Sequence, residues 1–132
     1  MRRPAMVVDS NERGTLCESV LRKAEKAGLS VIRRPLVVGD YLLGEACVEA
    51  KSINDLFLSS HSGHLWRQLE NMDINYQRFF LVIHGGIDKY VAMAKKSGKR
   101  VTYTRIQNEL TGTIARIMSD FEGQGFYTPN VS

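Results

Sequence analysis

Two carboxylates and a lysine are spaced along this chain so that they could share one site. Asp40 follows Gly39, and Glu49 and Lys51 come nine and eleven positions after Asp40. Side chains two positions apart on a β-strand point to the same face, so Glu49 and Lys51 would lie together, and a hairpin would bring Asp40 opposite them. Two close carboxylates repel unless a cation offsets their charge. Oxygen ligands without nearby His or Cys favour Mg²⁺ or Mn²⁺. Such a site suits phosphodiester hydrolysis, with Lys51 facing a phosphate oxygen or a metal-bound water.

The spacing by itself also fits a surface hairpin that carries a salt bridge. Further acidic residues favour the metal interpretation. Asp9 ends a short apolar segment, where α/β sheets often place ligand-binding groups, and Glu12 follows within one short turn. Asp55 lies four residues after Lys51, although helix capping also explains an acid in the first turn of a helix. Asp9 and Glu12 could likewise be ordinary loop acids.

Strands alternate with helices in the predicted secondary structure. Apolar runs between turn residues predict strands at 6–8, 29–34, 36–43, 46–51, 79–83 and 126–127. Pro35 indicates an edge or a bend, Gly39 a break, and the run at 79–83 a central strand covered on both faces. Apolar residues at helical spacing predict helices at 16–27, 52–59, 65–76, 87–96 and 104–121, with Ser52 as an N-cap. The order indicates an α/β fold, a mixed sheet with helices on both faces.

Length and composition bound the class of protein. The 132 residues fit one domain, and the 43% hydrophobic content suffices for a core. No apolar run is long enough to cross a bilayer and no signal peptide is visible, so we expect an intracellular protein that does not associate with membranes. Cys17 and Cys47 match no zinc spacing and are expected to be reduced and structural.

The formal net charge of +4 permits phosphate binding without proving it. Two basic clusters stand out, and each could simply be a solvated surface. The first comprises Arg22, Lys23, Lys26, Arg33 and Arg34, and the second comprises Lys95, Lys96, Lys99 and Arg100.

Three motifs together resemble the nuclease domain of the XPF family of structure-specific endonucleases, which includes the archaeal Hef nucleases. The family's Gly-Asp, Glu-Arg-Lys and Asp pattern reads Gly39-Asp40, Glu49-Ala50-Lys51 and Asp55. Its earlier Val-Asp-Ser-Arg-Glu motif reads Val8-Asp9-Ser10-Asn11-Glu12, and its later Gly-Arg-Leu-Phe-x-Gln segment reads Gly63-His64-Leu65-Trp66-Arg67-Gln68. The resemblance extends from Val7 to about Tyr127.

The resemblance implies a restriction-endonuclease-like, three-layer α/β sandwich of the PD-(D/E)XK type. Residues 1–132 would form a single nuclease domain without the helix-hairpin-helix domain that usually follows in the family. It also implies a Mg²⁺- or Mn²⁺-dependent endonuclease that cuts branched or nicked duplex DNA and works as a homodimer or with a related subunit. The implied catalytic residues are Asp40, Glu49 and Lys51, and the implied metal ligands are Asp9, Asp40 and Glu49. Glu12, Asp55 and Gln68 would support the site, and Arg13 and Arg67 are weaker candidates for DNA contact.

Departures from the family pattern leave alternatives open. Ala50 and Asn11 stand where the family has arginine. Strand alternation turns Ala50 away from Glu49 and Lys51, so its identity need not remove a ligand. The chain could still be a non-catalytic DNA-binding partner of an active subunit, or a four-way-junction resolvase. His84 and Trp66 are expected to be structural. The apolar stripe of the last helix fits either core packing or a dimer interface.

Overall fold

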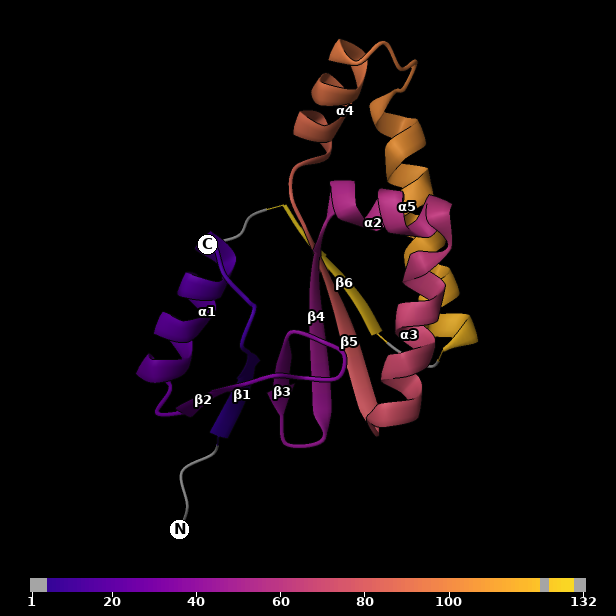
Figure 1. Ribbon diagram of the computed structural model, residues 1–132. Helices are drawn as coiled ribbons and strands as arrows, with labels where there is room; N and C mark the ends of the chain where they lie inside the picture. The colour runs from indigo at the N-terminus through magenta and orange to yellow at the C-terminus, as the bar shows by residue number, and fades with distance from the viewer. Residues whose placement is uncertain (1–4, 122–123, 130–132) are drawn as a thin grey trace.

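A twisted six-stranded sheet with helices on both faces forms the computed structural model, which describes residues 5–121 and 124–129 (Figure 1). The order of strands across the sheet is β2-β1-β3-β4-β5-β6. The strands are β1 (Ala5–Asp9), β2 (Ser30–Arg34), β3 (Tyr41–Leu43), β4 (Ala46–Ser52), β5 (Arg78–His84) and β6 (Gln124–Thr128). The helices are α1 (Thr15–Lys26), α2 (Ile53–Ser62), α3 (His64–Asn75), α4 (Ile87–Lys96) and α5 (Tyr103–Asp120). The α/β class and the predicted order of elements are confirmed.

Strand direction brings the candidate site to one edge of the sheet. Only β3 is antiparallel to its neighbours, and the pairs β1–β2, β4–β5 and β5–β6 are parallel. Since β3 is antiparallel to both β1 and β4, those two strands run in the same direction. The carboxyl ends of β1, β4 and β5 therefore lie at the same edge, which is where Asp9 and Lys51 are found.

Two apolar clusters, one on each face of the sheet, hold the layers together. On one face, α1 packs its buried Cys17 and Ala24 against a small cluster that includes Met6, Val8 and Tyr41. On the other face, α2, α3, α4 and α5 form the larger core. Its fully buried members include Leu56, Leu65, Leu69, Leu81, Ile83 and Ile117. Strand alternation separates the faces within β4, because Cys47 belongs to the larger core while Val48 and Ala50 pack towards α1.

The predicted strand at 36–43 is wrong over most of its length. Only Tyr41–Leu43 forms a strand, and residues 36–40 make a loop between β2 and β3. The backbone of Gly39 has a φ of +89°, which directs the chain out of an extended path. Val37 is 86% exposed, so its apolar character did not indicate burial.

Smaller differences concern α2 and β5. Ser52 caps α2 as predicted, since its Oγ accepts a hydrogen bond from the Asp55 backbone N–H at 3.1 Å, but the helix continues to Ser62. β5 lies inside the sheet as predicted, yet only one of its faces is fully covered. Phe79, Leu81 and Ile83 are buried in the larger core, whereas Phe80 and Val82 on the other face are half-buried.

Other features bear on the sequence-based expectations. Cys17 and Cys47 are free and buried. Among the described residues, no helix is long and apolar enough to cross a membrane. Trp66 packs against the larger core and stacks on Phe121, with ring centroids 6.0 Å apart. The apolar stripe of α5 contributes Ile106, Leu110 and Ile117 to the core.

Candidate active site at the ends of β1, β3 and β4

Asp40 is fixed in place by three backbone hydrogen bonds. Its own N–H donates to the Val48 carbonyl at 2.9 Å, and its carbonyl accepts from the Asp9 N–H at 2.8 Å. Its side-chain Oδ2 accepts from the Ala50 N–H at 2.7 Å. The carboxylate is therefore anchored directly on β4 by a peptide group, independently of the side chain at position 50.

Glu49 faces α3 from the middle of β4 and is only 7% exposed. Its Oε1 accepts a hydrogen bond from Gln68 Nε2 at 2.6 Å, so α3 orients the carboxylate. Lys51 follows two positions later on the same face of β4, and its positive charge attracts Glu49. The structure thus brings Asp40, Glu49 and Lys51 together as the sequence predicted.

The two carboxylates have an electrostatic cost that a cation would remove. Burial raises the pKa of Asp40 to about 6, and the negative charge of Glu49 acts in the same direction. Burial also raises the pKa of Glu49, although Lys51 and the hydrogen bond from Gln68 oppose this effect. Asp40 and Glu49 interact directly through their carboxyl groups. A divalent ion between them would stabilise both in the ionised form.

Glu12 is the third acid at this cluster. Burial raises the pKa of Glu12 to about 7, and a hydrogen bond to the Asp40 carboxyl and the negative charge of Asp40 add to the rise. The backbone N–H of Glu12 donates to the Asp9 carbonyl at 3.0 Å, which holds the turn after β1 closed. Glu12 therefore supports Asp40 from the side of β1.

Asp9 holds the 36–40 loop. Its Oδ1 accepts a hydrogen bond from the Leu36 N–H at 2.9 Å. The hydroxyl of Tyr76, at the end of α3, donates to the Val38 carbonyl of the same loop at 2.9 Å. The loop is thereby fixed over the site from both sides.

Most of the candidate residues, though not Lys51, line two hollows on opposite faces of β4. A cleft of about 470 Å³ on the α3 face is lined by Asp9, the 36–40 loop, Glu49, His64, Arg67, Gln68 and Asn71. A hollow of about 340 Å³ on the α1 face is lined by Glu12, Arg13, Thr15, Leu16, Ala50, Ser52, Asp55 and His84. Asp55 and Arg13 are thus on the other side of β4 from Glu49. Asp40 contacts residues of both hollows, because its carboxylate hydrogen-bonds with Glu12 and accepts the Ala50 N–H.

Sequence reasoning missed two features of the site. It did not find that the Ala50 amide anchors Asp40, and it assigned the 36–40 loop to a strand. Gly39 was the available signal for the loop. His84, expected to be structural, lines the α1-side hollow, where burial lowers its pKa.

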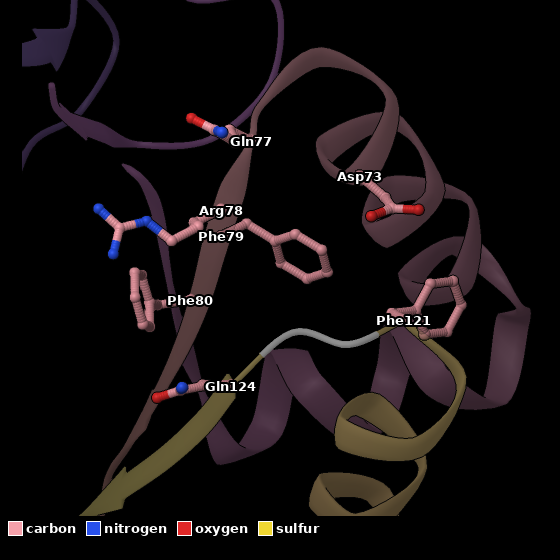
Figure 2. Close-up of a pocket in the computed structure, with 7 residues that line it drawn as sticks. All are labelled: Asp73, Gln77, Arg78, Phe79, Phe80, Phe121 and Gln124. Carbon is pink, nitrogen blue, oxygen red and sulfur yellow. The ribbon is translucent and has the colours of Figure 1, made fainter. Parts of the chain in front are cut away.

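A third hollow, of about 150 Å³, lies at the opposite edge of the sheet, where β5 and β6 begin (Figure 2). Phe79 points between α3 and α5, while Phe80 and Arg78 point away from them. Asp73, Phe121 and Gln124 also line this hollow. None of the residues predicted for catalysis lines this hollow.

The donor set at this cleft suits a hard divalent cation. Within residues 5–121 and 124–129 there is no group of three His, Cys, Asp or Glu side chains arranged to hold a metal ion. Mg²⁺ commonly keeps several waters and uses only one or two protein carboxylates together with substrate phosphates. Asp40 and Glu49 are each held by a protein N–H donor at one carboxylate oxygen, Oδ2 of Asp40 and Oε1 of Glu49.

Gln68 gives a direct test of how Glu49 is oriented. If Glu49 binds the metal, we expect Gln68→Leu to lower Mn²⁺ affinity and any metal-dependent activity by about 10- to 100-fold, because the variant cannot donate the hydrogen bond that orients this carboxylate. Calorimetric titration with Mn²⁺ measures the first effect. Asn71→Leu is the matched control, because Asn71 lies one turn later on α3 and lines the same cleft. This variant should change neither the Mn²⁺ affinity nor the metal-dependent activity. Equal effects of the two variants would contradict the role given to Gln68.

Comparison with known proteins decides the family. The ERCC4 domain matches residues 8–131, nearly the whole chain. This chain belongs to the ERCC4 domain family. Among its relatives, this ERCC4 domain is 38% identical over 93 residues to the DNA repair endonuclease UVH1 of Arabidopsis thaliana. That alignment covers 70% of the chain and 9% of the relative. It is 32% identical over 111 residues to the DNA repair endonuclease XPF of Cricetulus griseus, covering 82% of the chain and 12% of the relative. The chain therefore spans about a tenth of the length of these relatives.

Solved structures of this family have the same fold. XPF from Aeropyrum pernix superposes with a TM-score of 0.73 at 24% identity, over 97% of this ERCC4 domain and 58% of that chain. The structure of the same protein in complex with DNA superposes with a TM-score of 0.71, over 98% and 58%. The three-layer sandwich expected from the sequence is thus the fold of an XPF nuclease domain.

Proposed function

We propose that this ERCC4 domain is a metal-dependent endonuclease that hydrolyses phosphodiester bonds in branched or nicked duplex DNA. The observation that carries the proposal is the close pair of half-buried Asp40 and buried Glu49, whose pKa values are raised, beside Lys51. The relatives' names, DNA repair endonucleases, and the DNA bound to the Aeropyrum pernix XPF support the same substrate class.

Each residue has a role that its contacts support. A Mg²⁺ or Mn²⁺ ion held by Asp40 and Glu49 would supply an activated water and neutralise phosphate charge. The Ala50 amide and Gln68 keep the two carboxylates oriented towards each other. Lys51 would face a non-bridging phosphate oxygen and stabilise the charge that develops during in-line attack. Asp9 keeps the 36–40 loop over the cleft through its hydrogen bond with the Leu36 N–H. The expected products of hydrolysis are a 5′-phosphate and a 3′-hydroxyl.

A cleavage assay tests the proposal. The purified chain is incubated with end-labelled flap, fork and nicked-junction DNA in Mg²⁺ or Mn²⁺, with EDTA as the control. Cutting that requires the cation supports the proposal, whereas intact substrates in both cations at several protein concentrations contradict it. A four-way junction in the same panel separates a resolvase from a flap- or fork-directed enzyme.

A non-catalytic DNA-binding partner is the second candidate. Ala50, in the position of the family's arginine, motivates it. The structure weakens this motive, because position 50 supports Asp40 through its backbone N–H. Calorimetry with Mn²⁺ distinguishes the two, since a domain without metal affinity at Asp40 and Glu49 fits only the partner role.

Self-association and location also belong to this proposal. We infer that the domain acts inside the cell, where its DNA substrate is, as a dimer with a second copy or a related subunit. Light scattering on the purified chain measures its mass directly, and a monomer at all concentrations would leave only the related-subunit form.

The raised pKa values predict how stability changes with pH. Between about pH 4 and pH 7 the folded state binds more protons than the unfolded state, because the pKa values of Asp40, Glu49 and Glu12 are raised on folding. The free energy of unfolding of the metal-free protein should therefore fall as pH rises through this window. Thermal melts in EDTA at pH 5 and pH 8 measure this.

Divalent cations should reverse this trend. Mn²⁺ should raise the melting temperature more at pH 8 than at pH 5, because protons compete for the same oxygens at low pH. Asp40→Asn should flatten both dependences. A metal-free melting temperature that rises from pH 5 to pH 8 would contradict the electrostatic description of the site.

A further inference from the structure

The positive charge of the chain is concentrated in one segment. Residues 89–108 contain six of the 18 Lys and Arg residues and no Asp or Glu. The rest of the chain has 12 basic and 14 acidic residues, so it carries a net charge of −2 while this segment carries +6. Such a separation of charge directs a polyanion to one end of the molecule.

This segment forms a helical hairpin that projects from the sheet. Figure 1 shows α4 and the first part of α5 extending beyond the edge at which β4 ends and α2 begins, while the rest of α5 runs back along the sheet. That edge is the one that carries Asp9 and Lys51. The basic residues at the tip, Lys95, Lys96, Lys99 and Arg100, are all exposed.

The turn at the hairpin tip has a defined shape. The Gly98 N–H donates to the Lys95 carbonyl and the Lys99 N–H to the Ala94 carbonyl, both at 3.0 Å, which is the Schellman arrangement. Gly98 supplies the left-handed residue with a φ of +84°. Lys95 and Lys96 complement the dipole at the carboxyl end of α4, but Lys99 and Arg100 lie beyond the helix and do not have that role.

Contacts between the hairpin and α2 fix its position relative to the site. The rings of Phe57 on α2 and Tyr90 on α4 meet edge to face, with centroids 5.2 Å apart. His61 Nε2 at the end of α2 lies 2.7 Å from Glu109 Oε1 on α5. α2 follows directly on Lys51 and Ser52, so these contacts connect the hairpin to the segment that begins at the site.

A groove continues this connection on the surface. A hollow of about 200 Å³ between α2 and α4 is lined by Asn54, Tyr90, Met93, Ala94, Ser97 and Lys99. Asn54 is three residues from Lys51 and adjacent to Asp55. The groove therefore joins the first turn of α2 to the basic tip.

We propose that the tip of the α4–α5 hairpin binds the phosphate backbone of duplex DNA on one side of the scissile bond. The DNA would leave the site past Asn54 and reach Lys99 and Arg100. The inference rests on the proposed function, because it takes DNA as the substrate. It adds a surface, outside the carboxylate cluster, that holds substrate without acting on the reacting atoms.

The test compares two triple variants of equal net charge. One carries Lys96→Gln, Lys99→Gln and Arg100→Gln at the tip. The other carries Arg22→Gln, Lys23→Gln and Lys26→Gln on α1, where all three residues are exposed and the helix covers the other face of the sheet. Affinity for a fluorescent nicked duplex is measured by anisotropy over a range of NaCl concentrations, and thermal melts show that both variants are folded.

The tip variant should bind at least about tenfold more weakly than the wild type. Its slope of log K against log salt should fall by about 2–3, because each phosphate that a side chain no longer neutralises lowers the slope by about 0.9. The α1 variant should change much less. If wild-type protein binds and the two variants are weakened equally, the hairpin proposal fails while the proposed function stands. If the wild type neither binds nor cuts DNA, both fail. Preference for duplex RNA over DNA of the same sequence would also overturn the choice of partner.

Discussion

Replacing Asp40 with asparagine should reduce DNA cleavage by about a thousandfold or more. A metal ion stabilises the transition state of hydrolysis by several kcal/mol, and a thousandfold loss corresponds to about 4 kcal/mol. Asparagine has nearly the same size, and its Oδ1 can still accept the Ala50 N–H that now donates to Asp40 at 2.7 Å. The fold should therefore persist while the charge that would hold the cation is removed.

Single-turnover cleavage of a labelled flap measures this loss, and anisotropy in Ca²⁺ or EDTA measures DNA binding. Binding should change by less than about threefold. Any change should be towards tighter binding, because the substitution removes a negative charge near the phosphates. Asp73→Asn, an exposed acid on α3 away from the cleft, is the control for a change of one charge and should cut normally. Normal cleavage by Asp40→Asn would remove the basis of the proposed function.

Replacing Gly39 with alanine should destabilise the protein by about 2–5 kcal/mol. A Cβ at this position would lie 2.1 Å from Cys47 Sγ, and Cys47 is fully buried in the larger core. Overpacking of this kind costs about 1–3 kcal/mol, and the φ of +89° adds about 1–2 kcal/mol for any residue with a Cβ. The melting temperature should fall by roughly 10–20 °C for a domain of this size.

Two further variants separate these contributions. Gly44 has a comparable positive φ of +60°, but a Cβ added there has no atom within 4 Å. Gly44→Ala should therefore lower the free energy of unfolding only by the cost of the positive φ. The double variant Gly39→Ala, Cys47→Ala removes the sulfur and should recover part of the stability that Gly39→Ala alone loses. If Gly39→Ala is no less stable than Gly44→Ala, the close approach of the 36–40 loop to β4 is wrong.

Local patterns were enough to predict most of the fold. The alternation in β4, the cap at Ser52 and the apolar spacing of α3 and α5 depend on neighbours within a few positions of each other. For the same reason Glu49 and Lys51 could be placed on one face and Ala50 on the other. The motifs then placed Asp9, Asp40 and Gln68 near them.

The parts that were not predicted depend on contacts between distant residues. The 36–40 loop is held by Asp9 and by Tyr76, which is 38 residues away from its partner Val38, and no pattern within the loop reports these bonds. Leu36, Val37 and Val38 therefore resembled a strand. The division of the acids between two faces of β4 also depends on how the turn after β1 folds, which brings Glu12 to Asp40.

The hydrogen bond between the Ala50 amide and Asp40 has a consequence for how such proteins are found. Every amino acid except proline offers this N–H, so the middle position of the Glu-x-Lys triplet places no demand on the chemistry of the carboxylates. A search pattern that insists on arginine there would discard chains in which the aspartate is anchored in the same way. A more informative filter is the glycine before the aspartate, because a larger residue at that position would collide with the strand on which the triplet lies.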